Sequence, residues 1–326
     1  MKNTYDVIII GAGAAGMTAA IYTSRRMLKT LIISKDLGGQ ASLATEVENY
    51  PGFTETTSGF EIMQKFNQQA KKFGAEFIFD EVKTIQPQNN IFQVETNNQT
   101  YKAKTIILAF GLTPRDLNVF GEEKFKGKGV SYCATCDSLF YKNKIVSIIG
   151  GGNAALDATL LLSKIAKKVY LIHRRNEFRG DEILIQKIKK QKNVQFILNS
   201  IIKEIKGDEF VKSIIINNVD NKSEKEIATN GVFIEVGFEV KANFVKNLVD
   251  LDEKNQIITN KHCETSRPGI FAAGDATDIH YKQIIISAGE GAKAGLSAYK
   301  YIQAKENLKT SGLDWGEKKL KGKSKK

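Results

Sequence analysis

Two cysteines separated by two residues, Cys133 and Cys136, are the part of this chain best suited to chemistry. In a C-x-x-C pair the sulfurs can bond across a tight turn, and one thiol commonly has a lowered pKa that favours the reactive thiolate. Asp137 directly follows the second cysteine and could supply or remove the proton that disulfide exchange needs. The pattern therefore predicts a redox-active disulfide whose catalytic residues are Cys133, Cys136 and Asp137.

A structural zinc site is the alternative for the same pair, and it would need two further ligands. The remaining candidates are Cys263 and three histidines, His173, His262 and His280. None of these forms a second closely spaced cysteine pair, although His262 and Cys263 are adjacent. We therefore predict no metal, with zinc kept as an alternative.

The composition bounds the class of protein. A chain of 326 residues can bury a large core and suggests two domains. Three cysteines in that length indicate a reducing compartment, where a disulfide is catalytic rather than structural. No apolar stretch approaches the roughly 20 residues of a membrane span, and no signal-peptide core is present, so we expect a soluble cytoplasmic protein.

The formal charge of +12 raises the question of nucleic-acid binding. The excess positive charge gathers in the tail after residue 316 and in residues 164–192. No nucleic-acid-binding motif accompanies either stretch, and the tail has no apolar periodicity. We expect residues 313–326 to be a solvated, disordered tail, and we expect no nucleic-acid partner.

A dinucleotide-binding loop opens the chain. The buried-strand run 5–10 leads into Gly11-Ala12-Gly13-Ala14-Ala15-Gly16, followed by a helical stretch at 17–27 and a second strand at 30–34. In G-x-G-x-x-G the first glycine makes the turn, the second admits a pyrophosphate, and the third lets helix and strand pack closely. The second strand ends at Ser34 rather than at the usual acid, so Ser34 or Lys35-Asp36 would have to meet the ribose.

A second loop of the same kind follows the cysteine pair. A strand at 145–149 leads to Gly150-Gly151-Gly152-Asn153-Ala154-Ala155, then a helix at 156–164 and a strand at 168–172. Where an NAD site would carry an acid, this chain has His173-Arg174-Arg175, with Arg179 a turn later. Guanidinium groups at that position pair with a 2′-phosphate, which favours NADPH over NADH. The alternative is a solvated basic face.

Several further segments complete the expected layout. Residues 60–73 form an amphipathic helix, and strands near 77–85, 91–96 and 99–103 form a small antiparallel β-meander, followed by a buried strand at 105–109. Near the end, a buried strand closes on Gly274-Asp275 and precedes a helix at 287–301. An aspartate at the C-terminal edge of such a strand lies where ligands bind in open α/β sheets.

The motifs, in this order and spacing, resemble the low-molecular-weight thioredoxin reductases over residues 5–301. The resemblance implies an α/β fold with two Rossmann-like dinucleotide-binding domains. A discontinuous FAD-binding domain (1–113 and 244–312) would contain the β-meander, and an NADPH-binding domain (117–239) carrying the C-x-x-C pair would be inserted into it. Cys136 would face the flavin, Cys133 would attack the partner disulfide, and Asp137 would be the acid–base group.

The resemblance also implies the residues that bind each cofactor. For FAD they are Gly11, Gly13, Ala14, Ala15, Gly16, Ser34, Lys35, Gly38, Gly39, Gln40, Asn49, Val82, Gly111, Asp275, Lys282, Gln283 and Ile284. For NADPH they are Gly150, Gly152, Asn153, Ala155, His173, Arg174, Arg175 and Arg179.

Three positions depart from the family pattern. Phe110 replaces a threonine in an Ala-Thr-Gly turn, residues 240–243 lack a linker proline, and Leu139 replaces the first of two phenylalanines that can help grip thioredoxin. The first two departures bear on the flavin edge and the hinge, and the third bears on the choice of partner.

The expected activity is thioredoxin-disulfide reduction by a homodimer. Hydride would pass from NADPH to FAD, and electrons would then pass to the Cys133–Cys136 disulfide and to a thioredoxin-like protein. Because the cysteines and the nicotinamide belong to one domain yet must both reach the flavin, we expect a domain rotation with hinges near 113–116 and 237–243. The alternatives are a glutaredoxin-like or peroxiredoxin-linked partner, a flavin redox sensor or zinc-clamped binding protein, and a flavin reductase that serves a metal protein.

Overall fold

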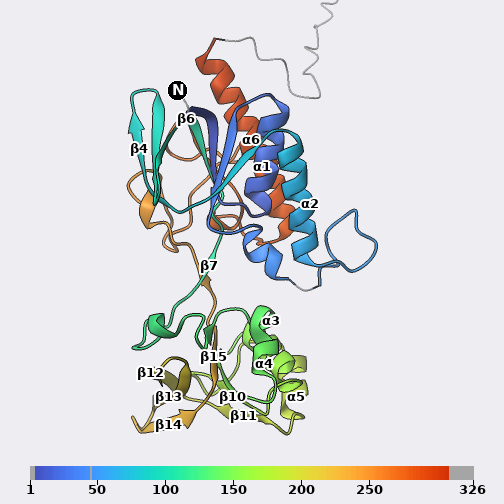
Figure 1. Cartoon of the computed structure of the whole chain (residues 1–326), viewed down its shortest axis with the longest axis vertical. Helices are drawn as coiled ribbons and strands as arrows, with labels where there is room; N and C mark the ends of the chain where they lie inside the picture. Colours follow the sequence, from blue (N-terminus) through green and yellow to red (C-terminus); the bar gives the residue numbers. More distant parts are fainter. Residues whose placement is uncertain (1–3, 45, 308–326) are drawn as a thin grey trace, which may run out of the picture.

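The computed structural model describes residues 4–44 and 46–307, which form two α/β bodies joined by a narrow connection (Figure 1). The first body is built on a seven-stranded sheet in the order β3-β2-β1-β6-β5-β4, with β17 paired to β6. The strands are β1 (Thr4–Ile10), β2 (Thr30–Ser34), β3 (Glu76–Phe79), β4 (Val82–Gln88), β5 (Ile91–Thr96), β6 (Thr100–Leu108) and β17 (Ile270–Ala272).

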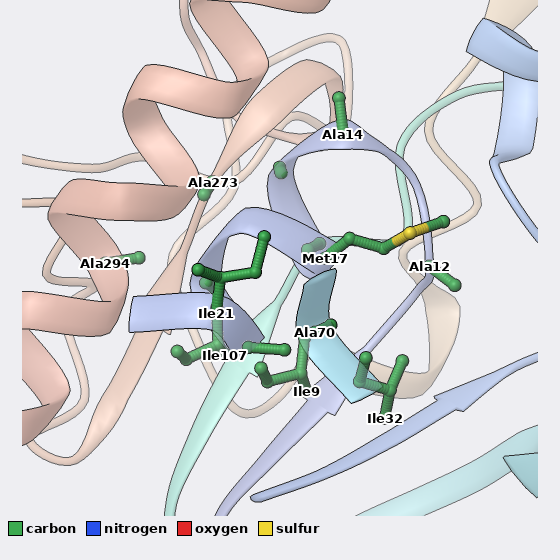
Figure 2. Packing of buried hydrophobic residues seen from close by; sticks show 14 of the residues in the cluster. Ile9, Ala12, Ala14, Met17, Ile21, Ile32, Ala70, Ile107, Ala273 and Ala294 are labelled. Carbon is green, nitrogen blue, oxygen red and sulfur yellow. The ribbon is translucent and has the colours of Figure 1, made fainter. Parts of the chain in front are cut away.

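Three helices pack on one face of the parallel part of this sheet: α1 (Ala14–Arg25), α2 (Gly59–Lys72) and α6 (Ile284–Lys305). The isoleucines Ile9, Ile32 and Ile107 from neighbouring strands meet Met17 and other apolar side chains of the helices (Figure 2). Helices α1 and α6 approach closely because small residues line their contact: a Cβ added to Gly291 would lie 2.0 Å from the Ala15 carbonyl oxygen. This packing fixes the start of α1 against the sheet edge.

The antiparallel meander is present, and its strand β5 has the predicted bounds, 91–96, whereas the neighbouring strands differ from the prediction. The expected strand at 77–85 is two strands, because the Asp80 carboxylate accepts hydrogen bonds from the amides of Glu81 (2.7 Å) and Asn97 (3.2 Å) and turns the chain. The expected strands at 99–103 and 105–109 are one strand, β6, which pairs antiparallel with β5 and parallel with β1. Lys104 lies within β6 and pairs with Asp6 at 2.8 Å, so it does not interrupt the strand.

The second body is built on a five-stranded parallel sheet in the order β11-β10-β9-β15-β8. Its elements are β8 (Val130–Ser131), α3 (Ala134–Asp137), β9 (Ile145–Gly150), α4 (Asn153–Ser163), β10 (Lys168–Ile172), α5 (Glu182–Lys189), β11 (Val194–Ile197) and β15 (Gly231–Glu235). A three-stranded antiparallel sheet adds β12 (Ser200–Gly207), β13 (Val211–Asn218) and β14 (Glu224–Ala228). The strands of this small sheet were not predicted from the sequence, although Ile202, Ile214 and Ile227 anchor it in the core.

Two short strands form the connection between the bodies (Figure 1). Strand β7 (Thr113–Pro114) pairs antiparallel with β16 (Phe238–Glu239), so the outgoing and returning segments run side by side. Short 3-10 turns complete the described chain: η1 (Gly39–Leu43), η2 (Glu123–Phe125), η3 (Ser138–Tyr141), η4 (Asn243–Val245) and η5 (Gly274–Ala276). The predicted lysine-rich tail, 313–326, lies outside the described residues.

Candidate functional site

A cavity of about 950 Å³ opens at the carboxyl edge of the seven-stranded sheet. Its size is that of a site for a large organic ligand. It contains most of the residues predicted from the sequence to hold FAD: Gly11, Gly13, Ala14, Ala15, Ser34, Lys35, Gly38, Gly39, Gln40, Val82, Gly111, Asp275, Lys282, Gln283 and Ile284. Residues far apart in the chain thus converge on one hollow.

The first glycine loop forms one wall of the cavity because the backbone there admits no side chain. Gly11 has a φ of +105°, and an added Cβ would lie 2.3 Å from the Ala109 carbonyl oxygen. Gly39 lies opposite, since a Cβ on it would come 3.8 Å from the Cα of Gly13. Helix α1 then begins with no side-chain cap and no acidic residue in its first turn. Uncapped N–H groups and the helix dipole favour a phosphate at this point.

Helix α6 starts at the same cavity with the same character. Its N-cap residue, Gln283, provides no side-chain cap, and no acidic residue occupies the first turn. Lys282, immediately before it, donates from Nζ to the Thr277 carbonyl oxygen at 2.8 Å, and burial lowers the pKa of this amine. Asp275 accepts from the Ser287 hydroxyl at 3.0 Å, and burial raises the pKa of its carboxyl group. Ser287 also lines the cavity and was not predicted.

Two predicted residues, Gly16 and Asn49, are placed beside the cavity rather than in its lining. A Cβ on Gly16 would lie 1.9 Å from the Gly11 carbonyl oxygen, so this glycine keeps α1 against the loop. Asn49 donates from Nδ2 to Gln283 Oε1 at 3.2 Å and so supports a lining residue.

The far end of the cavity holds an ion pair that sequence reasoning missed. Lys35 lies 2.7 Å from Glu81, and both residues line the cavity. The contact with Lys35 lowers the pKa of the Glu81 carboxyl group. Asp36 instead accepts from the Gly39 amide at 2.9 Å, and Ser34 accepts from the Ala12 amide at 3.2 Å. The pairing of β2 with β3 brings Glu81 here from a distant part of the chain, so no local pattern pointed to it.

Phe110, a departure from the family pattern, lines the cavity. Its ring meets Phe244 edge-to-face, with centroids 5.0 Å apart, and both residues line the cavity. The lining of the cavity thus includes an aromatic pair.

The second glycine loop lies in the other body, before α4. A Cβ on Gly150 would lie 2.3 Å from the Glu235 carbonyl oxygen and 2.6 Å from the buried Ala155. Helix α4 has Gly152 as an N-cap without a side-chain cap, and no acid in its first turn. Asn153 is tied to Asp181, whose amide donates to Asn153 Oδ1 at 2.7 Å. The loop therefore has the same phosphate-binding character as the first.

The basic residues beyond this loop divide into an exposed group and a buried one. Arg174, Arg175 and Arg179 are exposed, and the Arg179 amide donates to the Gly151 carbonyl at 2.7 Å. His173 is 5% exposed, stacks on Phe178, and lies where a Cβ of Gly151 would meet its ring at 2.2 Å. Burial lowers the pKa of His173, and its Nε2 has no hydrogen-bond partner among the described residues. The arginines, rather than this buried ring, have the exposure that a phosphate contact needs.

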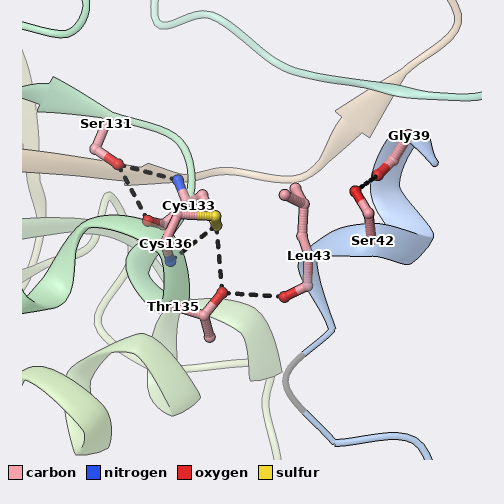
Figure 3. The surroundings of a disulfide bond; sticks show 7 residues. All are labelled: Gly39, Ser42, Leu43, Ser131, Cys133, Thr135 and Cys136. Atoms are coloured by element: carbon pink, nitrogen blue, oxygen red, sulfur yellow. Dashed lines mark hydrogen bonds between the residues drawn. A yellow bond between two sulfur atoms is a disulfide. The ribbon is translucent and has the colours of Figure 1, made fainter. Parts of the chain in front are cut away.

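Cys133 and Cys136 form a disulfide around the start of α3. Cys133 is the N-cap of that short helix, and its sulfur accepts from the Cys136 amide at 3.2 Å (Figure 3). Ser131 holds the main chain of Cys133, with its hydroxyl 3.1 Å from the Cys133 nitrogen. Cys136 is exposed and Cys133 is half-buried, while Leu139 and Phe140 are 78% and 73% exposed beside them. A protein partner could therefore reach the disulfide.

A buried acid that sequence reasoning missed lies between the cysteines and the second glycine loop. Glu235 ends β15 in register with Gly150, and the Ala134 amide at the start of α3 is its hydrogen-bond partner. Burial raises the pKa of Glu235 to about 7. Glu235 is an acid within the apolar run 232–236, and this pattern could have identified it from the sequence.

The cavity is lined by the first body and the two linkers, whereas the disulfide and the second glycine loop belong to the second body. Within residues 4–44 and 46–307, His, Cys, Asp and Glu side chains form no group of three or more that could hold a metal ion. None of the helices placed by the structure has the length and apolar character that a membrane span requires.

The combination of two phosphate-binding loops with a closely spaced disulfide defines a class of redox enzyme. A family model described as pyridine nucleotide-disulphide oxidoreductase matches residues 5–306. The chain belongs to this family and is an oxidoreductase, and membership implies a flavin and NADPH as electron carriers.

Within the family, the similar proteins share a more specific name, thioredoxin reductase. A thioredoxin reductase of Listeria monocytogenes is 42% identical over 311 residues, covering 94% of this chain and 97% of that protein. One of Treponema pallidum is 39% identical, covering 94% of this chain and 100% of its own length. The crystal structure of Lactococcus lactis thioredoxin reductase in the FR conformation matches with a TM-score of 0.80 and 39% identity, covering 92% of this chain and 99% of that chain.

Proposed function

We propose that this chain is a thioredoxin-disulfide reductase that passes electrons from NADPH through FAD and the Cys133–Cys136 disulfide to a thioredoxin-like protein. The observation that carries the proposal is a disulfide with an exposed cysteine, which lies on the same body as one phosphate-binding loop, while the other loop lines the cavity of the first body. The names of the relatives favour this activity over a redox sensor or a zinc-clamped binding protein.

FAD fits the cavity because the hydrogen-bond donors that line the cavity match the groups of a dinucleotide. The N-termini of α1 and α6 would receive the pyrophosphate, and Ser34 with the Lys35–Glu81 pair would meet the adenosine end. Asp275, Lys282 and Gln283 would hold the polar edge of the ring system. When bound, FAD would take up a hydride from NADPH and supply two electrons to a disulfide.

NADPH fits the second loop, where Gly150, Gly152, Asn153 and Ala155 begin α4. Arg174, Arg175 and Arg179 are exposed cations that would pair with the 2′-phosphate, and guanidinium groups bind phosphate through several N–H donors at once. His173 would support the loop from beneath through its contact with Gly151.

The cysteines would reduce the partner by thiol–disulfide exchange. The Cys133 thiolate attacks one sulfur of the partner disulfide, a mixed disulfide forms, and the other partner sulfur leaves as a thiolate. Cys136 then attacks Cys133, the enzyme disulfide re-forms, and the partner departs as a dithiol. Asp137 would supply the proton that the leaving sulfur takes up.

A domain rotation would link these steps, because the disulfide lies outside the cavity that would hold FAD. The paired strands β7 and β16 are the hinge we propose, since they are the segments through which the chain passes between the bodies. A covalent crosslink between η1 and α3 should abolish turnover while FAD stays bound. Full activity of the crosslinked protein would contradict the rotation.

The activity is tested by NADPH-dependent reduction of a disulfide dye, with and without the organism's own thioredoxin. We expect rapid reduction that requires thioredoxin, and in Cys133→Ser a flavin still bleached by NADPH but no dye reduction. A wild-type protein that reduces the dye only with a glutaredoxin-like or peroxiredoxin-linked carrier would keep the chemistry and change the partner. A protein that is not bleached by NADPH would contradict the proposal.

We further infer that the protein works as a homodimer in the reducing cytoplasm, where a lone surface disulfide would be catalytic. Light scattering during size-exclusion chromatography tests the dimer.

A further inference from the structure

The hydroxyl of Thr135 lies between the redox-active sulfur and the other body of the protein. Its Oγ1 is 3.2 Å from Cys133 Sγ and 3.2 Å from the carbonyl oxygen of Leu43, at the end of η1 (Figure 3). Thr135 is exposed and belongs to α3, so this hydroxyl is a polar contact between the cysteine turn and the first body.

A threonine hydroxyl has one proton to donate. In the disulfide form Cys133 Sγ has no charge and is a weak acceptor, whereas the Leu43 carbonyl is a strong one. The hydroxyl therefore donates its hydrogen bond to the Leu43 carbonyl oxygen while the cysteines are oxidised. In the reduced form a thiolate at Cys133 becomes the better acceptor, because hydrogen bonds to charged groups are about twice as strong as neutral ones.

We propose that Thr135 is a positioning residue whose hydroxyl donates a hydrogen bond to the Leu43 carbonyl in the oxidised protein and to the Cys133 thiolate in the reduced protein. This inference rests on the proposed function, in which Cys133 is the nucleophile. A hydride equivalent from NADPH breaks the S–S bond and leaves one thiolate and one thiol. The Thr135 hydroxyl and the Cys136 amide, 3.2 Å from the sulfur, then favour the thiolate on Cys133. When the hydroxyl turns to the thiolate, its hydrogen bond to Leu43 in η1 is lost.

The first test measures the thiolate directly, without NADPH or FAD chemistry. In a Cys136→Ser background, Cys133 is the reactive cysteine, because Cys263 is 1% exposed. We would reduce the full-length protein with a phosphine and follow iodoacetamide alkylation of Cys133 against pH. Thr135→Val should raise the midpoint of the pH profile by about one pH unit, and Thr135→Ser should restore it.

Ser131→Ala is the matched control, because that hydroxyl bonds the main chain of Cys133 and not its sulfur. The neighbouring carboxylates Asp137 and Glu235 are unchanged in every variant, so the shift isolates the hydroxyl. An identical midpoint in Thr135→Val and in the parent would overturn the proposal.

The second test follows the contact with η1 by hydrogen exchange in peptides covering residues 39–43 and 134–137. Reduction should increase exchange in the protein with both cysteines, and oxidised Thr135→Val should already show the increase. Equal exchange in all three states would overturn the release. Should dye reduction by the wild-type protein fail while the alkylation shift appears, the proposed function would be wrong and the local role of Thr135 would stand.

Discussion

Lys241 Nζ lies 2.9 Å from Asp116 Oδ2, and this ion pair joins the two segments that connect the bodies. Asp116 also accepts from the Tyr132 hydroxyl at 2.8 Å, one residue before Cys133. Burial acts to raise the pKa of Asp116, but the hydrogen bonds from Lys241, Tyr132 and Lys126 together hold it down at about 2. The returning linker, the outgoing linker and the cysteine turn therefore meet at one carboxylate.

Replacing this carboxylate should weaken the hinge. Asp116→Asn should lower stability by about 1 kcal/mol at pH 7, a value reduced for solvent screening because the side chain is 22% exposed. A carboxyl group whose pKa is lowered in the folded protein stabilises the fold at pH values above its ordinary pKa. This contribution disappears as the pH falls toward 2. The difference in melting temperature between wild type and variant should therefore shrink below pH 4.

Asp208→Asn is the control for the hinge prediction, since Asp208 pairs with Lys212 on the exposed surface, away from the linkers. It should leave the melting temperature unchanged. A pH-independent difference for Asp116→Asn would show that the charge is not its cause.

The exposed arginines should decide between the two pyridine nucleotides. Arg174→Ala with Arg175→Ala should raise KM for NADPH far more than for NADH, because each lost contact to the 2′-phosphate costs on the order of 1.5–3 kcal/mol. Steady-state kinetics with both nucleotides measure this. Equal losses for NADPH and NADH would mean that the phosphate site is wrongly assigned.

Glu235 should make stability fall as pH rises. Its pKa of about 7 in the folded protein exceeds its ordinary value of 4.5, so the folded state binds more protons between these values. The contribution of Glu235 to the stability of the fold is therefore greatest below pH 4.5. It decreases as the pH rises to about 7, by a total of about 3 kcal/mol.

Glu235→Gln should remove that decrease while keeping an acceptor for the Ala134 amide. Melting temperatures of wild type and variant between pH 4.5 and 8 measure the effect, with the variant gaining most at high pH. Parallel curves would contradict the raised pKa.

Gly11 should tolerate no side chain. Gly11→Ala meets the Ala109 carbonyl oxygen at 2.3 Å with a φ of +105°, so strain of about 1–2 kcal/mol adds to overpacking of about 1–3 kcal/mol. Gly52→Ala is the matched control, because it has a φ of +101° and no atom within 4 Å of the added Cβ. We expect loss of bound flavin in Gly11→Ala and retention in Gly52→Ala, measured by the absorbance of the purified proteins.

The predictions made from local spacing were the most accurate. The strand, glycine loop and helix at residues 4–25 and again at 145–163 appear within a few residues of their expected bounds. Such units depend on backbone geometry within about 30 residues of chain, which a short pattern encodes. The strand bounds at 77–85 and 99–109 were wrong, because the Asp80 turn and the continuity of β6 depend on pairing with distant strands.

The sequence by itself identified the family and predicted a redox-active cysteine pair and two dinucleotide loops, since each follows from residue types at short, strict spacing. Tertiary structure alone decided that Glu81 and Ser287 join the cavity, that His173 is buried, and that Thr135 reaches Leu43. It also placed the disulfide outside the cavity. The physical reason is that these relationships join residues distant in the chain, so they depend on how sheets and linkers pack and no local pattern contains them.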